Sequence, residues 1–410
     1  MDQSSPFAKP PFAVSAEANL SPFKISVSEE EILRLKKLLE LSTVAAPNWE
    51  NSKADANFGV SHNWLTNAVQ HWQQSYNWRE WEEKLNSFPQ YTIKIEDDGN
   101  HYTVHFLCLF STSTSAVPIV FLHGWPGSVL EFLPMLLHVR AKYPTPDVLP
   151  YHVIVPHLVG FGYSSPPPLD RDFGLKDNAR IVSKLMHLLG FADDQRGYVA
   201  QGGDVGSAVA PETAGLDPAC RLVHVNMIFM PPPDGVDVES DIANGKYTDN
   251  EVWALQHAAE VFKSGSAYSQ LQGTRPATAG FAIGSNPISL LAWIGEKMLQ
   301  WCDSRSQPSL DFILTNVSLY WFSGCYPSSI WPYRMVVRDG MDMKSGWENV
   351  QVPMGYSWFK YELLSPPRHW LDIMGKVKWY RAHDKGGHFA ALEQPKVLWE
   401  DVTEFVNELF

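Results

Sequence analysis

Apolar residues recur at helical spacing in the first part of the chain. The segment EEEILRLKKLLEL follows Ser28, and it predicts an amphipathic helix with Ser28 as its N-cap and acidic residues in its first turn. The segment HNWLTNAVQHWQQSYNWREWEEKLNSF predicts one or two further helices. Its tryptophans have helical spacing, which favours packing against a neighbouring domain over a platform for a ligand. The first 20 or so residues are polar and contain proline, and we expect them to form an arm.

From Tyr91 the apolar residues alternate with polar ones, as they do in strands. YTIKIE and YTVHFLCLF flank Asp97-Asp98-Gly99-Asn100, which predicts an antiparallel hairpin. Short apolar runs of the buried parallel type follow, separated by helical stretches such as EFLPMLLHVRAKY and NARIVSKLMHLLGF. These runs cover residues 117–122, 152–155, 197–200 and 221–228. The order of elements predicts the α/β class, with a mostly parallel, doubly wound sheet.

The alternation of strands and helices stops at Met230-Pro231-Pro232-Pro233, and about a hundred residues of mostly helical pattern follow. Strand patterns return in VPMGYSWF and KVKWYRAHD, and QPKVLWEDVTEFVNELF predicts a final helix. We therefore predict four parts. They are an N-terminal arm and helical extension (1–90), the first part of an α/β core (91–232), a helical lid (233–335) and the second part of the core (336–410).

Composition narrows the possible partners. The formal net charge is -13, from 32 basic and 45 acidic residues, and no block of Lys or Arg is present, which argues against binding to nucleic acid or to an anionic membrane. The four cysteines lie far apart without CxxC spacing, so we expect reduced thiols and no metal site. No stretch approaches the roughly 18 apolar residues that span a bilayer. We expect a soluble, cytoplasmic protein without a membrane anchor.

The most informative motif lies where a buried strand ends. Tyr198-Val-Ala-Gln runs directly into Gly202-Gly203-Asp204-Val205-Gly206, which resembles the Gly-x-nucleophile-x-Gly elbow of α/β-hydrolases with an aspartate at its centre. A carboxylate there would lie at a helix N-terminus, where the dipole and the free N–H groups keep it ionised. On this segment alone, an aspartate that merely caps the helix is an open alternative.

A second motif, His123-Gly124-Trp125-Pro126-Gly127-Ser128, follows the strand that ends at Leu122. In α/β-hydrolases the loop at this position supplies one backbone N–H of an oxyanion hole, and the residue after the nucleophile supplies the other. This resemblance makes the N–H groups of Trp125 and Val205 the expected donors.

A nucleophilic aspartate forms an ester, and hydrolysis of that ester requires a base and an acid that orients it. In α/β-hydrolases these residues follow the last strands in the order acid, then histidine. His388 stands after the final strand, and Glu362 stands after the preceding one, so we predict them as base and acid. The rival carboxylates are less favoured: Asp339, Asp342 and Glu348 precede that strand, and Asp384 follows the wrong one.

Several phrases together resemble the microsomal-type epoxide hydrolases, in particular their soluble fungal branch. They are PFKISVSEEEILRLKKLL, HGWPGS, PHLVGFGYSSPP, QGGDVGS, PISLLAWIGEKMLQW, VSLYWF and GGHFAALEQP, and they span nearly the whole chain. The resemblance implies an α/β-hydrolase fold and a pair of lid tyrosines that bind the epoxide oxygen. By their motifs these are Tyr268, ahead of Thr274-Arg275-Pro276, and Tyr333, ahead of Arg334, with Tyr320 and Tyr326 as rivals for the second. It also implies that the acid is Asp or Glu, which Glu362 satisfies, and that a homodimer is plausible.

The sequence therefore predicts an epoxide hydrolase. Asp204 would open a small hydrophobic epoxide through a covalent ester, and water activated by His388 would release a vicinal diol, with no metal or organic cofactor. The main alternative is a biosynthetic enzyme in which a hydroxyl of the substrate opens the epoxide and forms a cyclic ether. A haloalkane dehalogenase is disfavoured by the two tyrosine phrases, and a serine esterase by the absence of a serine at the elbow. A non-catalytic ligand-binding relative would tolerate loss of these residues, and none is lost.

Overall fold

The structure is a computed structural model that describes residues 5–10, 14–15, 18–53, 58–192, 197–338 and 350–410. These residues form a nine-stranded sheet in the order β1-β2-β3-β5-β4-β6-β7-β8-β9. The pairs from β1 to β5 are antiparallel, and the remaining pairs are parallel, as the sequence predicts. The strands are β1 (Ser21–Pro22), β2 (Gln90–Asp97), β3 (Asn100–Leu109), β4 (Val117–Leu122), β5 (Tyr151–Pro156), β6 (Tyr198–Gly202), β7 (Cys220–Val225), β8 (Met354–Tyr361) and β9 (Val377–Gly387).

The predicted hairpin is formed by β2 and β3. Asp97 pairs with Asn100 across the turn, and Asp98 and Gly99 between them have φ values of 50° and 75°. Two successive residues with positive φ are typical of the two-residue turns that match the twist of the flanking strands. The predicted hairpin, including its turn residues, is therefore confirmed.

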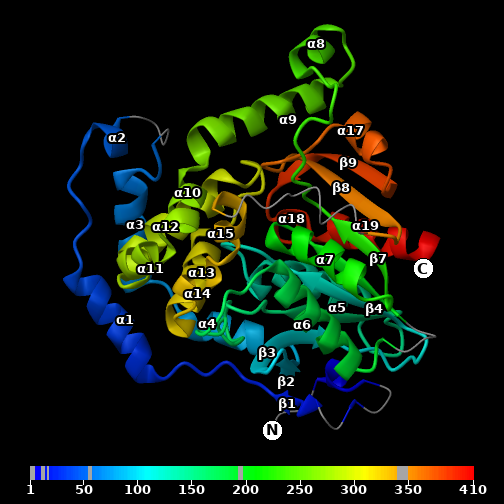
Figure 1. Ribbon diagram of the computed structural model, residues 1–410. Helices are drawn as coiled ribbons and strands as arrows, with labels where there is room; N and C mark the ends of the chain where they lie inside the picture. The colour runs from blue at the N-terminus through cyan, green and yellow to red at the C-terminus, as the bar shows by residue number, and fades with distance from the viewer. Residues whose placement is uncertain (1–4, 11–13, 16–17, 54–57, 193–196, 339–349) are drawn as a thin grey trace.

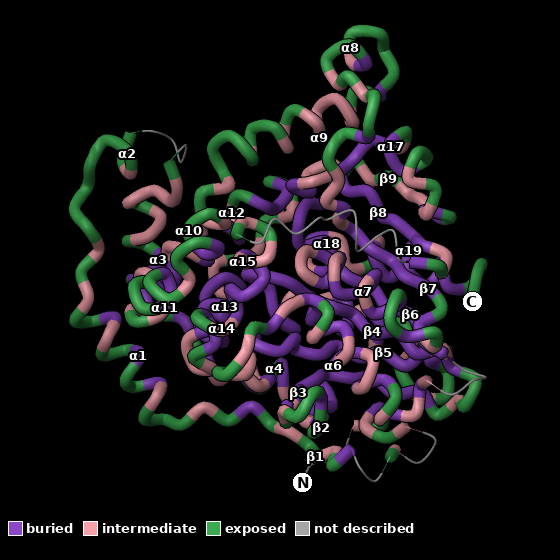
Figure 2. Tube along the Cα trace, viewed as in Figure 1, coloured by how far each residue is buried: buried purple, intermediate pink, exposed green. Residues whose placement is uncertain are grey.

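Helices cover both faces of the sheet (Figure 1). On one face α6 (Leu175–Leu188) packs against α7 (Val205–Leu216), which contacts β4, β6 and β7. On the other face η3 (Val129–Phe132) leads into α5 (Leu133–Lys142), which packs against α18 (Ala390–Glu393) and α19 (Pro395–Leu409). The central strands β4, β5, β6 and β7 are almost entirely buried, and they form the centre of the core (Figure 2). This is the doubly wound arrangement that the sequence predicts.

The described residues between β7 and β8 are mostly helical and lie beside the carboxyl ends of the parallel strands, and their helices are called the lid below (Figure 1). Its helix α8 projects from the rest of the molecule, whereas α12 and α13 pack against each other and bury most of their side chains. The helices are α8 (Val238–Ala243), α9 (Asp249–Glu260), the π-helix η4 (Val261–Gly265), α10 (Ala267–Thr274), α11 (Pro276–Gly284), α12 (Pro287–Gln300), α13 (Leu310–Ser323), α14 (Tyr326–Ser329) and α15 (Pro332–Val337). A further helix, α17 (Arg368–Met374), connects β8 with β9.

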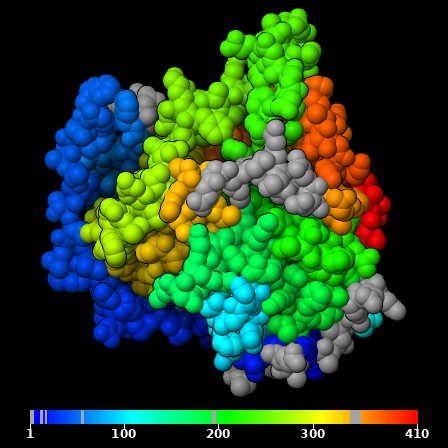
Figure 3. All heavy atoms as spheres, viewed as in Figure 1, coloured from blue at the N-terminus to red at the C-terminus, as the bar shows by residue number. Residues whose placement is uncertain are grey.

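The N-terminal helices flank the lid rather than the sheet (Figures 1 and 3). They are α1 (Glu29–Leu41), α2 (Trp49–Ser52), α3 (His62–Gln74) and α4 (Trp78–Asn86). Ser28 caps α1 as predicted, because its hydroxyl accepts the Glu31 N–H at 3.2 Å. The ring of Trp78 packs on Phe322 with centroids 5.0 Å apart, which confirms that these tryptophans pack against a neighbouring part of the chain.

Two predicted features differ from the structure. The expected arm is partly packed: the short helix η1 (Pro6–Ala8) buries Phe7, and Phe7 O accepts the Phe110 N–H at 3.0 Å. The predicted strand 221–228 ends earlier, because β8 pairs with β7 only as far as Val225. Both predictions fail for the same reason: where an element begins and ends depends on long-range pairing and packing, which the local sequence pattern does not specify.

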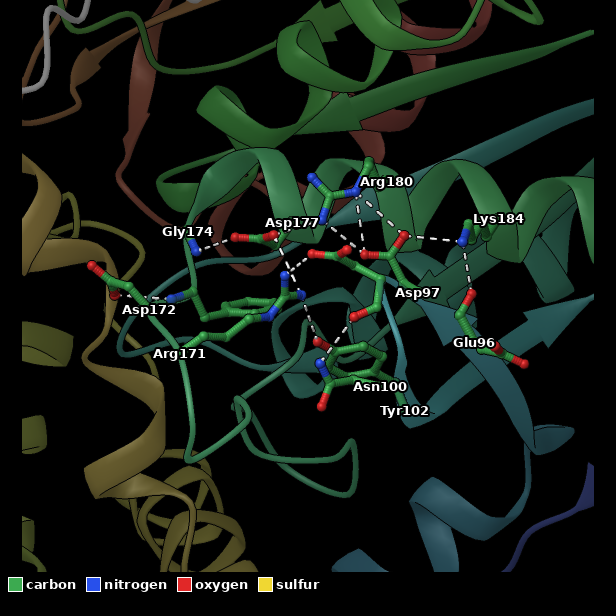
Figure 4. A network of polar contacts seen from close by, with 12 residues as sticks. Glu96, Asp97, Asn100, Tyr102, Arg171, Asp172, Gly174, Asp177, Arg180 and Lys184 are labelled. Atoms are coloured by element: carbon green, nitrogen blue, oxygen red, sulfur yellow. Dashed lines mark hydrogen bonds and ion pairs between the residues drawn. The ribbon is translucent and has the colours of Figure 1, made fainter.

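A network of ion pairs ties the hairpin to α6 and to the loop that precedes it (Figure 4). Asp97 is buried, and it pairs with Arg180 Nη2 at 2.8 Å and with Lys184 Nζ at 3.0 Å. Asp172, in the loop before α6, pairs with Arg334 of the lid helix α15 at 2.5 Å. The loop before α6 therefore connects the core with the lid helix that carries Tyr333.

Candidate active site

Asp204 occupies a strained turn between β6 and α7. Its φ of 48° and ψ of -123° lie in a region that residues with a side chain rarely adopt. Its carboxylate makes no capping bond to α7, so the alternative of a simple helix cap fails. A Cβ on Gly206 would lie 2.1 Å from Leu122 O, which explains why the turn requires glycine there. The geometry is that of a nucleophile elbow.

The loop after β4 approaches the Asp204 carboxylate from one side. The Trp125 N–H donates to Asp204 Oδ1 at 2.7 Å. A Cβ on Gly124 would lie only 2.0 Å from the same oxygen, so glycine is needed at this position. Val205 is the first residue of α7 and lines the cavity next to Asp204. Its role as the second oxyanion donor remains a prediction.

His388 lies between two carboxylates. Its Nε2 is 3.2 Å from Asp204 Oδ2, and its Nδ1 is 2.8 Å from Glu362 Oε1. Both His388 and Glu362 are buried, with 4% and 0% of their surface exposed. Burial by itself lowers the pKa of His388, but the charge of Glu362 and the contact with Asp204 outweigh it and raise the pKa well above its usual value.

Of the rival acids, Asp384 is the one among the described residues, and it lies elsewhere. Asp384 is exposed, and its carboxylate accepts a hydrogen bond from Asn250 at 2.7 Å. Asp339, Asp342 and Glu348 lie outside the described residues. Glu362 is thus the predicted acid that the structure brings to the base.

The glycine pair before His388, a pattern that by itself favours a loop, is part of a strand. β9 continues to Gly387, which pairs with Tyr361 of β8, so the base follows the strand directly. Side chains from other elements fix this end of β9: Gly386 N–H donates to Asp303 Oδ2 at 3.0 Å, and Gly387 N–H donates to Glu393 Oε2 at 3.0 Å. Two adjacent glycines suggest a loop when read locally, but pairing with β8 and these side-chain acceptors hold them in the strand.

Two lid tyrosines meet above the loop after β4. Tyr268 belongs to α10 and Tyr333 to α15, and their ring centroids lie 5.4 Å apart. The Trp125 ring stacks on Tyr268 at 5.5 Å and meets the ring of Tyr333 edge-on, also at 5.5 Å. Burial, with the nearby charge of Asp204, raises the pKa of both hydroxyls, so both are protonated at neutral pH.

The rival tyrosines are engaged in other contacts. Tyr320 is buried, and its hydroxyl donates to Gly127 O at 2.8 Å. Tyr326 is buried as well, and its hydroxyl donates to Gln272 Oε1 at 3.2 Å. Unlike Tyr333, neither lines the cavity next to Asp204.

A cavity of about 330 Å³ connects Asp204 with Tyr268 and Tyr333. Most of its remaining wall is apolar, and the tryptophans of the lid do not contribute to it. The apolar side chains are Leu175, Val205, Ala208, Met227, Phe229, Val261, Phe262, Pro332, Val336, Val337, Leu363 and Leu364. The cavity suits a small hydrophobic ligand whose reacting end lies between the carboxylate and the hydroxyls.

Glu393, to which no motif assigned a role, supports the segment that carries His388. Its carboxylate accepts N–H groups from Gly387 at 3.0 Å, Phe389 at 3.1 Å and Asp303 at 2.7 Å. It therefore joins the strand end that carries His388 to the lid. Burial raises the pKa of Glu393 to about 7. Its place in the phrase GGHFAALEQP was the only available signal.

Other expectations concern metals, thiols and membranes. The four cysteines are free and buried. Among the described residues, His, Cys, Asp and Glu form no group of three or more that could hold a metal ion. No single helix in the described part of the chain is long and apolar enough to cross a membrane, although the bent pair α11 and α12 meets these criteria when its helices are taken together.

Comparison with known proteins identifies the family. Residues 20–132 match the family model described as epoxide hydrolase N terminus, and residues 117–262 match the alpha/beta hydrolase fold. A putative epoxide hydrolase of Dothistroma septosporum is 40% identical over 393 residues, which cover 95% of this chain and 90% of the relative. This chain belongs to the epoxide hydrolase family.

The wider comparison agrees with this assignment. Epoxide hydrolase 1 of Sus scrofa is 30% identical over 422 residues, which cover 97% of this chain and 90% of that protein. The structure of Aspergillus niger epoxide hydrolase matches with a TM-score of 0.88 and 41% identity, covering 98% of this chain and 100% of that one. This epoxide hydrolase thus has the α/β-hydrolase fold, and the predicted fold and family resemblance are confirmed.

Proposed function

We propose that this epoxide hydrolase uses Asp204 as its nucleophile, Tyr268 and Tyr333 as acids, and His388 with Glu362 as the base system. One observation carries the proposal: the Asp204 carboxylate contacts the Trp125 N–H and His388 Nε2 while it lines the cavity that both lid tyrosines share. A carboxylate opposite two protonated phenols is suited to break a strained C–O bond.

In the first step, Asp204 Oδ2 attacks a carbon of the epoxide. Oδ1 is the oxygen that the Trp125 N–H holds, which leaves Oδ2 as the attacking atom. The C–O bond of the ring breaks, and its electron pair moves to the epoxide oxygen. That oxygen takes a proton from one of the two tyrosines, and the product is a β-hydroxyalkyl ester of Asp204.

Formation of the ester prepares the base for the second step. The raised pKa of His388 depends partly on the negative charge of Asp204, and esterification removes that charge. The imidazolium then releases its proton, which restores the tyrosine. The neutral Nε2 takes a proton from water, the water oxygen attacks the ester carbonyl, and the Trp125 and Val205 N–H groups stabilise the oxyanion. Each such donor is typically worth roughly 3 kcal/mol.

Replacement of His388 by glutamine tests the scheme. This variant should form the ester with styrene oxide and fail to hydrolyse it, so intact-protein mass spectrometry should find a mass increase equal to that of the epoxide. If no adduct forms with a substrate that the wild type converts, the covalent mechanism is wrong. Asp204→Asn should form no adduct, apart from a slow recovery if the amide deamidates.

Product analysis separates hydrolysis from its alternatives. A vicinal diol that carries ¹⁸O after many turnovers in labelled water supports hydrolysis, whereas an unlabelled cyclic ether supports attack by a hydroxyl of the substrate. Release of halide from a haloalkane would indicate a dehalogenase, although paired tyrosine hydroxyls are not the N–H donors that such an enzyme needs. A protein that binds the epoxide without converting it would be a ligand-binding relative.

We propose, further, that the protein is cytoplasmic and forms a homodimer. The acidic net charge of -13 is compatible with the first proposal, and the resemblance to its family supports the second. Fractionation of cells and sedimentation of the purified chain test them. A membrane-bound fraction or a monomer at micromolar concentration would contradict them.

A further inference from the structure

A second, much smaller chamber adjoins the Asp204–His388 pair. It measures about 10 Å³, and it shares only Asp204 and His388 with the lining of the substrate cavity. Its remaining lining comes from the loops after β4, β6 and β7 and from the segment that follows His388. These residues are Gly124, Trp125, Glu131, Phe132, Gly203, Asn226, Phe389, Ala390, Ala391 and Leu398.

Glu131 of η3 contributes a carboxyl group to this chamber. The loop makes room for it through Gly127, because a Cβ there would lie 1.9 Å from Glu131 Oε2. The Ser128 N–H donates a hydrogen bond to the carboxyl group. The two glycines of the HGWPG phrase thus accommodate two carboxyl groups, Gly124 for Asp204 and Gly127 for Glu131.

The surroundings of Glu131 raise the pKa of its carboxyl group. The chamber lining contains no lysine or arginine, and the charged or titratable neighbours are Asp204, His388 and Tyr320. Burial and the Asp204 charge raise the pKa of Glu131 well above its usual range, against the opposing effect of His388. A neutral carboxyl group can donate one hydrogen bond and accept others.

The chamber has the size and polarity that a single water molecule needs. A buried water requires roughly 10–15 Å³ of accessible space and two to four polar partners. Glu131, Asn226 and His388 are polar residues that line this space of about 10 Å³. By contrast, the larger cavity is mostly apolar and takes up the substrate.

We infer that Glu131 is a positioning residue, which holds the hydrolytic water in this chamber next to the ester carbonyl of Asp204. The inference rests on the proposed function. The water oxygen bonds to Asp204 Cγ, and its proton passes to His388 Nε2. The ester C–O bond then breaks, and the departing alkoxide takes that proton back from His388. Asp204, left as a carboxylic acid, passes the second proton of the water to His388, which restores the starting pair. Glu131 gains and loses no proton and forms no covalent bond in this step. It only positions the water.

This placement bears on the fate of the ester. Water in the small chamber approaches Asp204 without passing through the substrate cavity, because the two linings share only the catalytic pair. A chamber of about 10 Å³ cannot admit a substrate hydroxyl together with the carbon that bears it. Once the ester has formed, the small chamber therefore favours water over a substrate hydroxyl as the group that cleaves it.

The test separates the two steps in single turnovers with styrene oxide. Quenched samples are analysed by intact-protein mass spectrometry, which follows formation and decay of the Asp204 ester. Glu131→Leu should form the ester within about twofold of the wild-type rate and hydrolyse it roughly 10- to 100-fold more slowly, as expected for a misplaced reactant. Glu131→Gln keeps a polar group in the chamber and should restore most of the decay rate.

Two further variants complete the design. Gly127→Ala keeps Glu131 but displaces its carboxyl group, so it should also slow ester decay. If Glu131→Leu does not fold, this variant tests the role of Glu131 in its place. Glu212→Leu is the matched control. It removes a half-buried glutamate of α7 whose pKa burial also raises, and it should leave both rates unchanged.

The outcomes distinguish the inference from the proposed function. Ester decay at the wild-type rate in Glu131→Leu, or in Gly127→Ala if the former does not fold, overturns the inference. An equal loss in formation and decay without rescue by glutamine shows a merely structural role and overturns it as well. Failure of His388→Gln to accumulate any ester refutes the covalent mechanism itself, whatever the Glu131 variants do.

Discussion

Replacement of His224 by glutamine should remove a defined part of the protein's sensitivity to acid. His224 is fully buried on β7, where its Nε2 lies 3.1 Å from Ser357 Oγ. Burial lowers the pKa of His224 from 6.5 to about 4. His224 therefore becomes protonated below about pH 6.5 in the unfolded chain, but only below about pH 4 in the folded chain. The folded state loses stability as the pH falls through this window.

The size of the effect follows from the two pKa values. One pKa unit corresponds to about 1.36 kcal/mol, so His224 costs roughly 2 kcal/mol of stability at pH 5 and about 3 kcal/mol at pH 4. Glutamine carries no titrating group and can still bond to the Ser357 hydroxyl. The free energy of unfolding of both proteins should fall between pH 7 and pH 5. We expect this fall to be about 2 kcal/mol smaller in His224→Gln than in the wild type.

The assay measures denaturant unfolding by tryptophan fluorescence at both pH values, together with proton uptake on unfolding. Near pH 5.5 the wild type should take up about 0.9 proton more than the variant. Ser357→Ala is the matched control, because it removes the hydroxyl but leaves the buried imidazole. It should destabilise the protein and keep the full pH dependence. Equal pH dependence in His224→Gln and the wild type would refute the reasoning.

Two other predictions concern the active site and its support. Tyr268→Phe and Tyr333→Phe should each slow ester formation about 100-fold, as expected for loss of a general acid, and leave hydrolysis of the ester less affected. Stopped-flow single turnovers measure both rates. Unchanged rates of ester formation would show that neither hydroxyl acts on the epoxide. Glu393 has a pKa raised from 4.5 to about 7, so the folded state binds its proton more tightly and stability falls as the pH rises through that window. Glu393→Gln should abolish this loss of stability, which amounts to about 3 kcal/mol over the whole window. Unfolding curves are measured at pH 5 and pH 8. The same change in the free energy of unfolding between these pH values in the variant and the wild type would contradict the prediction.

Local patterns were sufficient for features whose physics is local. The hairpin turn depends on residues that adopt positive φ, and the cap of α1 depends on a hydroxyl three residues before the N–H it accepts. The elbow could be predicted for a related reason, since a sharp turn between a strand and a helix demands small residues on both sides of Asp204. The candidate base and acid followed from the order of strands, which one chain direction and right-handed crossovers restrict.

Residues that meet across long stretches of chain could not be decided in this way. The sequence determined that an aspartate elbow, a late histidine, several carboxylates and several tyrosines exist. Only the tertiary structure decided that Glu362 lies 2.8 Å from His388, that Tyr268 and Tyr333 share a cavity with Asp204, and that β9 extends to the base. It also placed Glu131 in the same small chamber as Asp204, which no motif predicted. The reason is physical: local patterns depend on neighbours along the backbone, whereas a catalytic site depends on distances that form only when the core and lid pack together.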